Sequence, residues 1–218
     1  SAASDVYKRQ VSIYGSTDKF MLKQMLDEAQ VGYYATALAL CNSWVFVLSA
    51  IIDSLYPIIL QSFEKNCAQF ERRNRQLYAI VFYCSVCASG LLSVLAAPIV
   101  SILYGAEYLP AAAPLRIITW YTAFSYLGVA RNAWIVCYHK QSYLKYLYIG
   151  SAITNVILNV CMIPRWGASG AAMASLITQI STILIFPAMI KDLRPNVRLM
   201  LDAIRLKGVF LREEENHN

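Results

Sequence analysis

Residues 77–105 read LYAIVFYCSVCASGLLSVLAAPIVSILYG, a stretch without a single Asp, Glu, Lys, Arg or His. A second uncharged stretch extends from Trp166 to Ile190. A helix of about 20 apolar residues crosses the hydrocarbon layer of a membrane, so both stretches are long enough. Because lipid offers the backbone no hydrogen-bond partners, each must be a helix or a strand of a closed barrel. Barrel strands alternate polar and apolar residues, and these stretches do not. The sequence therefore predicts a helical membrane protein.

The rest of the chain shares this apolar character. Of its 218 residues, 58% are hydrophobic and 15% are charged, and the mean hydropathy is +0.45. A soluble domain carries charge on about a quarter of its residues, because its surface faces water. The net charge of +6 is compatible with a nucleic-acid partner. The basic residues gather in particular loops, however, so we predict membrane lipids and no nucleic acid as partners.

Motifs for catalysis or metal binding are absent from the sequence. The pair Cys84-x-x-Cys87 has the spacing of a metal or redox pair. It lies in the middle of an apolar stretch, without a second pair or a nearby His. The chain also lacks a Walker-type loop, paired histidines and a nucleophile with an evident base. We therefore predict no metal, no cofactor and no enzymatic activity.

The expected fold class is an all-α, polytopic transmembrane helical bundle. A shorter segment, Val11–Leu26, is interrupted by charged residues, and we interpret it as a span that has lost its beginning. The predicted domains are an unassigned N-terminal remnant (1–10), a transmembrane lobe (11–190) and a basic tail (191–218). The five full spans that we expect are Tyr33–Leu60, Leu77–Tyr104, Pro114–Tyr138, Tyr146–Pro164 and Ala168–Ile190.

Basic residues in alternate loops predict the orientation. The loops Gln61–Gln76 and His139–Lys145 and the tail are rich in Lys and Arg, whereas the loops between them are not. By the positive-inside rule, the basic loops and the C-terminus face the cytoplasm. Tyr33 and Tyr34 are expected among the aromatic residues of the outer interface. The tail from Lys191 reads either as an amphipathic helix on the membrane or as a solvated tail.

Charged residues inside the predicted spans are the candidate site residues. At mid-membrane such a side chain costs about 2.5–3.5 kcal/mol on insertion scales, so it normally faces protein or a water-filled interior. The candidates are Asp18, Asp53, Arg116 and Arg131. For Arg131 we expect a water-filled cavity, with an ion pair to Asp53 as the alternative. Arg116 lies near an outer end, where it either lines the cavity or extends to the interface.

Small and amide residues predict helix packing. Asn155 and Asn159 share a helix face, and asparagines at this spacing bond across to a neighbouring helix. Gly167-Ala-Ser-Gly170 opens an apolar span, where small residues let helices approach closely.

Several short motifs together resemble one family. Asp18-Lys-Phe-Met-Leu, followed by Val31-Gly-Tyr-Tyr-Ala-Thr-Ala, is similar to the second-half entry of bacterial polysaccharide (O-antigen type) flippases. These belong to the multidrug and oligosaccharidyl-lipid exporter superfamily. The resemblance continues in Leu127-Gly-Val-Ala-Arg131-Asn-Ala-Trp134 and from Asn155 to the small residues after Gly167. It extends over about Val11 to Arg194.

The resemblance implies a transporter of about twelve spans in two lobes, of which this chain supplies the second. The N-terminal lobe of the same protein is then a partner. Such proteins move undecaprenyl-pyrophosphate-linked oligosaccharide across the bacterial inner membrane by alternating access. Carried over, Arg131 is the first candidate to meet the pyrophosphate, Arg116 the second, and Asp18 serves ion coupling or structure. The alternative is a related ion-coupled exporter of drugs or other small molecules.

Overall fold

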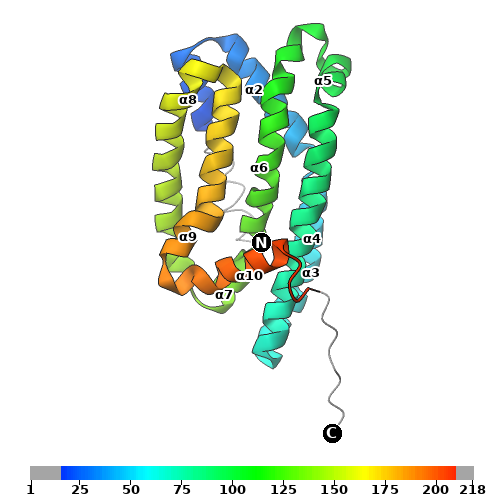
Figure 1. The fold of residues 1–218 in the computed structure, drawn as a ribbon, viewed down its shortest axis with the longest axis vertical. Helices are drawn as coiled ribbons and strands as arrows, with labels where there is room; N and C mark the ends of the chain where they lie inside the picture. The colour runs from blue at the N-terminus through cyan, green and yellow to red at the C-terminus, as the bar shows by residue number, and fades with distance from the viewer. Residues whose placement is uncertain (1–15, 210–218) are drawn as a thin grey trace.

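The computed structural model describes residues 16–209, and within them every regular element is a helix. Three stretches are long and apolar enough to cross a membrane: Phe46–Lys65, Cys67–Val94 and Gln141–Met189. The prediction of an all-α polytopic membrane protein is thereby confirmed. The predicted remnant, residues 1–10, lies outside the described residues. Figure 1 shows an upright bundle; we call its bottom end in this view, where α10 lies, the lower end.

The elements follow one another with few connecting residues. The first part comprises a helical segment at 16–25, α2 (Glu28–Asn42), α3 (Phe46–Lys65), α4 (Cys67–Val94), α5 (Ala96–Tyr104) and the 3-10 helix η1 (Ala106–Ala111). The second part comprises α6 (Ala112–Ala130), α7 (Asn132–Cys137), η2 (Gln141–Tyr143), α8 (Leu144–Ile180), the π-helix η3 (Ser181–Ile185), α9 (Phe186–Met189), η4 (Lys191–Leu193) and α10 (Arg194–Ile204).

The predicted loop Gln61–Gln76 is wrong, because these residues are helical except at one position. Only Asn66 separates α3 from α4, and its side-chain oxygen accepts a hydrogen bond from the Ala68 amide at 2.8 Å. Asparagine is a favoured N-cap for this reason. The charged and amide residues that suggested a loop are themselves good helix formers. The two helices therefore continue beyond the apolar stretch instead of ending with it.

The predicted span Tyr33–Leu60 is wrong as a single helix, because α2 ends at Asn42 and α3 begins at Phe46. One further break inside a predicted span, and one between two predicted spans, have a local cause. The span Leu77–Tyr104 is interrupted at Leu95, because Pro98 has no amide hydrogen to donate to the carbonyl of Val94. Gly167 divides α8 with φ 54° and ψ −132°, a conformation that favours glycine. Figure 1 shows the chain rising before this turn and descending after it. α8 thus supplies the predicted span Tyr146–Pro164 and begins the span Ala168–Ile190, which η3 and α9 continue.

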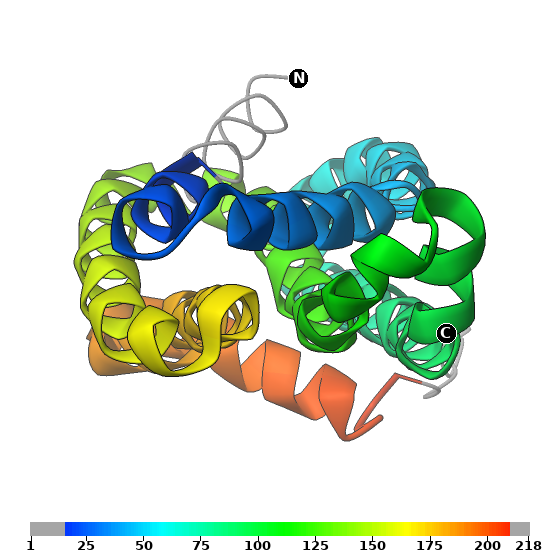
Figure 2. The ribbon, with the colours of Figure 1, turned by 90° about the horizontal axis from the view of Figure 1, so that it is seen from above.

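Two clusters of buried side chains form the core. One joins α3, α4 and the C-terminal half of α6 to α10, and includes Tyr78, Leu127 and Met200. The other joins Leu22, α2 and α5 to the N-terminal half of α6 and the turn of α8. In the view of Figure 2, α6 lies between the α8 side and the α4 side of the bundle. α6 therefore contributes buried residues to both clusters and connects them.

The tail forms helix α10 and packs against the bundle. Its buried residues include Val197, Leu199, Met200 and Ala203, and they join the core cluster around α4. The interpretation as a solvated tail is wrong for residues 194–204. An amphipathic helix is present, but its apolar side is covered by protein, so the expectation that this side lies on the membrane is wrong.

Candidate functional site

Asp18 lies at the centre of a buried polar cluster. Its side chain is 0% exposed. Oδ2 accepts hydrogen bonds from the Tyr34 hydroxyl at 2.5 Å and from the Ser175 hydroxyl at 2.5 Å. Oδ1 accepts one from Asn159 Nδ2 at 2.6 Å. Three segments that are distant in the sequence therefore converge on one carboxyl group.

The asparagines on the first half of α8 extend this cluster. Asn159 Nδ2 also lies 3.2 Å from Asn155 Oδ1. Asn159 Oδ1 and Asn155 Nδ2 are buried without a hydrogen-bond partner in the described part of the chain. The prediction that Asn159 bonds across to a neighbouring helix is confirmed.

The chemistry of the Asp18 cluster follows from its charge. All three donors to the carboxyl group are neutral, and no Lys or Arg among residues 16–209 pairs with it. A carboxylate without a cation is expensive to bury, so the group must either hold a proton or attract a cation. The arrangement can therefore bind and release a positive charge.

Two partners of Asp18 were missed by reasoning from the sequence. Tyr34 was expected in an aromatic belt at the interface, but it is 1% exposed and points into the cluster. That assignment is wrong, because the hydroxyl finds its partner inside the protein. Ser175 lies among small residues, where a serine gives no signal beyond close packing. For both residues, the role becomes visible only when the fold brings the side chain next to Asp18.

Arg131 is a buried cation at the junction of α6 and α7. Its side chain is 2% exposed. Nε and Nη1 are buried and have no hydrogen-bond partner within residues 16–209. The side chains of Tyr148 and Tyr78 interact electrostatically with its guanidinium group. Buried guanidinium nitrogens without acceptors are rare, and each requires an explanation.

A pocket lies beside Arg131, between α6, α8 and η3. Asn132, Tyr148, Gln179 and Thr182 give it polar walls, and Gly128 and Ile183 complete it. A Cβ on Gly128 would lie 2.7 Å from Ile183 Cδ1, so glycine permits the close approach of α6 to η3. Ser181–Ile185 form a π-helix, an irregularity that is frequent at functional sites. The pocket is thus a polar recess with an unsatisfied cation in its wall.

The other two candidates lie apart from Arg131. Arg116 is exposed and lies fifteen positions before Arg131, or about 22 Å along the helix. Asp53 is exposed on α3, and no ion pair joins it to Arg131 in the described part of the chain. The alternative of an Asp53–Arg131 ion pair is therefore wrong. The structure brings Asp18 and Arg131 close to the same helix, α8, and leaves Asp53 and Arg116 on the surface.

Both polar sites use residues of α8. Ser175 donates to Asp18, and Gln179, one helical turn further on, lines the Arg131 pocket. On the first half of α8, Tyr148 lines the pocket and Asn155 belongs to the Asp18 cluster. At 1.5 Å per residue, Ser175 and Gln179 are about 6 Å apart along the axis.

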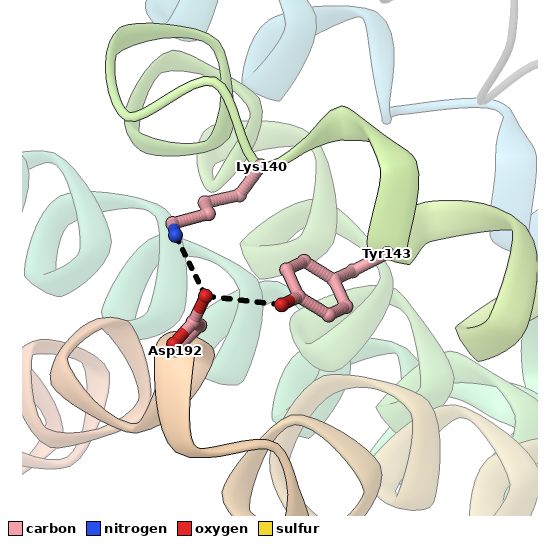
Figure 3. A network of polar contacts seen from close by, with 3 residues as sticks. All are labelled: Lys140, Tyr143 and Asp192. Carbon is pink, nitrogen blue, oxygen red and sulfur yellow. Dashed lines mark hydrogen bonds and ion pairs between the residues drawn. The ribbon is translucent and has the colours of Figure 1, made fainter.

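A third polar group lies at the lower end of the bundle (Figure 3). Asp192 Oδ2 accepts hydrogen bonds from Lys140 Nζ at 2.7 Å and from the Tyr143 hydroxyl at 3.0 Å. The hydrogen bond from Lys140 lowers the pKa of Asp192 below its ordinary value of 3.8, and Tyr143 adds to this. The hydrogen bond that Lys140 donates to Asp192 raises the pKa of Lys140 above its ordinary value of 10.5. The group ties the turn after α7 to the start of α10.

We predict that Asp192→Asn loosens the start of α10 without unfolding the bundle. Amide exchange of residues 191–200 should become several-fold faster at neutral pH, because the charged pair is lost. The carboxylate contributes above its unfolded pKa, and this contribution disappears as pH falls through its lowered folded pKa. Wild type and variant should therefore exchange alike at strongly acid pH. Equal exchange at neutral pH would show that the pair does not hold α10; Asp202→Asn is the control.

The described helices define the class of this protein as an α-helical membrane protein. A comparison with protein families gives a more specific relationship. Residues 8–113, just under half of the chain, match the model of a family of polysaccharide biosynthesis proteins. The predicted relationship is confirmed over these residues, which include Asp18 and Asp53 but neither arginine. No curated protein and no solved structure matches the chain.

Proposed function

We propose that this protein is a transporter, and not an enzyme, that flips undecaprenyl-pyrophosphate-linked oligosaccharide across the bacterial inner membrane by alternating access. The observation that carries the proposal is the buried guanidinium of Arg131, whose Nε and Nη1 lack partners among residues 16–209. A pyrophosphate offers paired acceptor oxygens that fit a planar guanidinium. The match to polysaccharide biosynthesis proteins supports a lipid-linked sugar as the cargo.

The side from which the cargo is loaded follows from the same residues. Basic residues gather at the lower end, around Lys140 and along α10, as the positive-inside rule requires of a cytoplasmic face. We propose that the lower end and the C-terminus are cytoplasmic. Arg131 precedes Lys140 by nine residues and so lies in the cytoplasmic half of its span. In this orientation it meets the pyrophosphate early, where the lipid-linked sugar enters.

Asp18 supplies the proposed coupling. A carboxyl group held by Tyr34, Ser175 and Asn159 can exchange a proton or a small cation as the transporter changes conformation. In the two-lobed architecture that the resemblance implies, the exposed Asp53 faces the cavity between this lobe and the N-terminal lobe. Arg116 remains a second cation for the same cavity, near its outer end.

The decisive experiment is complementation. The complete gene that encodes this chain is expressed in a strain that lacks its own polysaccharide flippase, and surface glycan is measured. We expect restored glycan in at least one of a panel of strains with different repeat units. The contrary result is that the protein reaches the membrane but restores glycan in none of the strains, and makes the cells resistant to toxic compounds. That result would contradict the flippase proposal and favour the alternative, a drug exporter.

A further inference from the structure

α10 is fastened to the bundle along one side. Figures 1 and 2 show it running along one face of the bundle, from α9 toward α4. Asn196, which is 1% exposed, donates to the Tyr78 hydroxyl at 2.7 Å. Near the other end, the Tyr83 hydroxyl donates to the carbonyl of Ile204 at 2.7 Å. With its apolar residues also buried, α10 cannot insert this side into lipid.

The opposite side of α10 carries a row of arginines. Arg194, Arg198 and the C-capping Arg205 are all exposed. Spacings of four and then seven residues place them on one helical face, and at 1.5 Å per residue the row is about 16 Å long. We call these three residues the arginine row.

Within residues 16–209, no ion pair neutralises the arginine row. Asp202, on α10 itself, lies one helical turn from Arg198 and from Arg205 and forms an ion pair with neither. Asp192 is the nearest acid before α10, and its Oδ2 is already bonded to Lys140 and Tyr143 (Figure 3). Arg194 Nε donates to the carbonyl of Ala188 at 2.9 Å, which orients this guanidinium without removing its charge. The row therefore presents three exposed guanidinium groups that form no ion pair within the described residues.

We propose that the arginine row binds the phosphates of anionic phospholipid headgroups in the leaflet beside α10. Guanidinium groups bind phosphate oxygens in pairs. Basic residues at an anionic membrane surface each raise the affinity about fivefold. α10 runs along one face of the bundle and buries its apolar side there, so its exposed side faces away from the bundle. In the proposed membrane placement, we infer that this exposed side meets lipid headgroups. The inference needs the membrane placement of the protein but not the identity of the cargo.

The test uses the purified protein in nanodiscs of phosphatidylcholine, with and without phosphatidylglycerol. Thermal unfolding and the phosphatidylglycerol retained in native mass spectrometry are measured for wild type and for Arg194→Gln/Arg198→Gln/Arg205→Gln. The charge-matched control is Lys65→Gln/Arg73→Gln/Lys145→Gln, since these three cations are exposed elsewhere. If the triple variant fails to fold, Arg198→Gln is tested alone, because Arg198 is exposed and forms no ion pair with the bundle within residues 16–209.

We expect phosphatidylglycerol to stabilise wild type and the control. The triple variant should bind it roughly a hundredfold more weakly, and Arg198→Gln about fivefold. Raising the salt concentration should reduce the difference. Equal retention by wild type and the triple variant would overturn the proposal. So would equal stabilisation by inorganic phosphate, because the site would then serve a soluble anion. Transport is not measured, so failure here leaves the flippase proposal intact.

Discussion

Arg131→Ala should abolish glycan export in the complementing strain while leaving the protein at least as stable as wild type. Two charge-assisted hydrogen bonds to the pyrophosphate would be lost, and at about 1.5–3 kcal/mol each this predicts a fall of roughly a hundredfold or more. Stability should not fall, because the substitution removes a buried guanidinium whose Nε and Nη1 lack partners within the described chain. Export is measured as surface glycan, and stability as thermal unfolding of the purified variant.

The comparison variants separate charge from geometry. Arg131→Lys keeps the charge but not the planar fork, so export should recover only in part. Arg73→Ala removes an exposed cation from α4 and should leave export unchanged. If Arg131→Ala exports normally, the guanidinium is structural. Should it lose both export and stability, Arg131 would be a packing residue and not a binding residue.

Gly170→Ala should strongly destabilise the second half of α8. A Cβ at this position would lie 2.4 Å from the carbonyl oxygen and 2.7 Å from the carbonyl carbon of Met162. These are backbone atoms of the facing helical segment, so they cannot rotate away as a side chain would. Overpacking of this kind costs about 1–3 kcal/mol, or more where the backbone must shift. Thermal unfolding in detergent and the yield of folded protein measure the loss.

Gly90→Ala is the matched control for Gly170→Ala. Gly90 lies within α4, and a Cβ there would meet no atom within 4 Å. Alanine in an open helical position is favoured over glycine by roughly 0.5–1 kcal/mol. The same chemical change should therefore stabilise the protein at Gly90 and destabilise it at Gly170. Similar effects at both positions would mean that the contact with Met162 is not what requires glycine.

The apolar stretches predicted the fold class because the physics of lipid leaves few alternatives. Helix ends were harder to predict where charge and helix propensity disagree. The stretch around Asn66 is highly charged, which is typical of a loop, but its residues have high helix propensity. In the structure this stretch is helical, so the two helices extend beyond the apolar region. The turn at Gly167 was placed correctly between two spans, since glycine and Pro164 mark it in the sequence.

The sequence predicted individual residues of the candidate site, but not which residues lie next to one another. Asp18 and Arg131 were identifiable because charge is costly in a predicted span, and both are buried. Their surroundings were not, because Tyr34 and Ser175 reach Asp18 from segments far away in the chain. The same rule selected Arg116 and Asp53, which are exposed. A span position alone does not say which side of the helix faces the protein.

The sharing of α8 by the two polar sites has a thermodynamic consequence. Ser175 and Gln179 are one turn apart on a single helix, so a displacement of that turn alters the surroundings of Asp18 and of Arg131 together. If a proton or cation at Asp18 changes the affinity of the pocket for an anion, the anion must change the affinity of Asp18 by the same factor. Cargo and coupling charge would then act as mutual allosteric effectors, and a titration with either one would report the energy of the other.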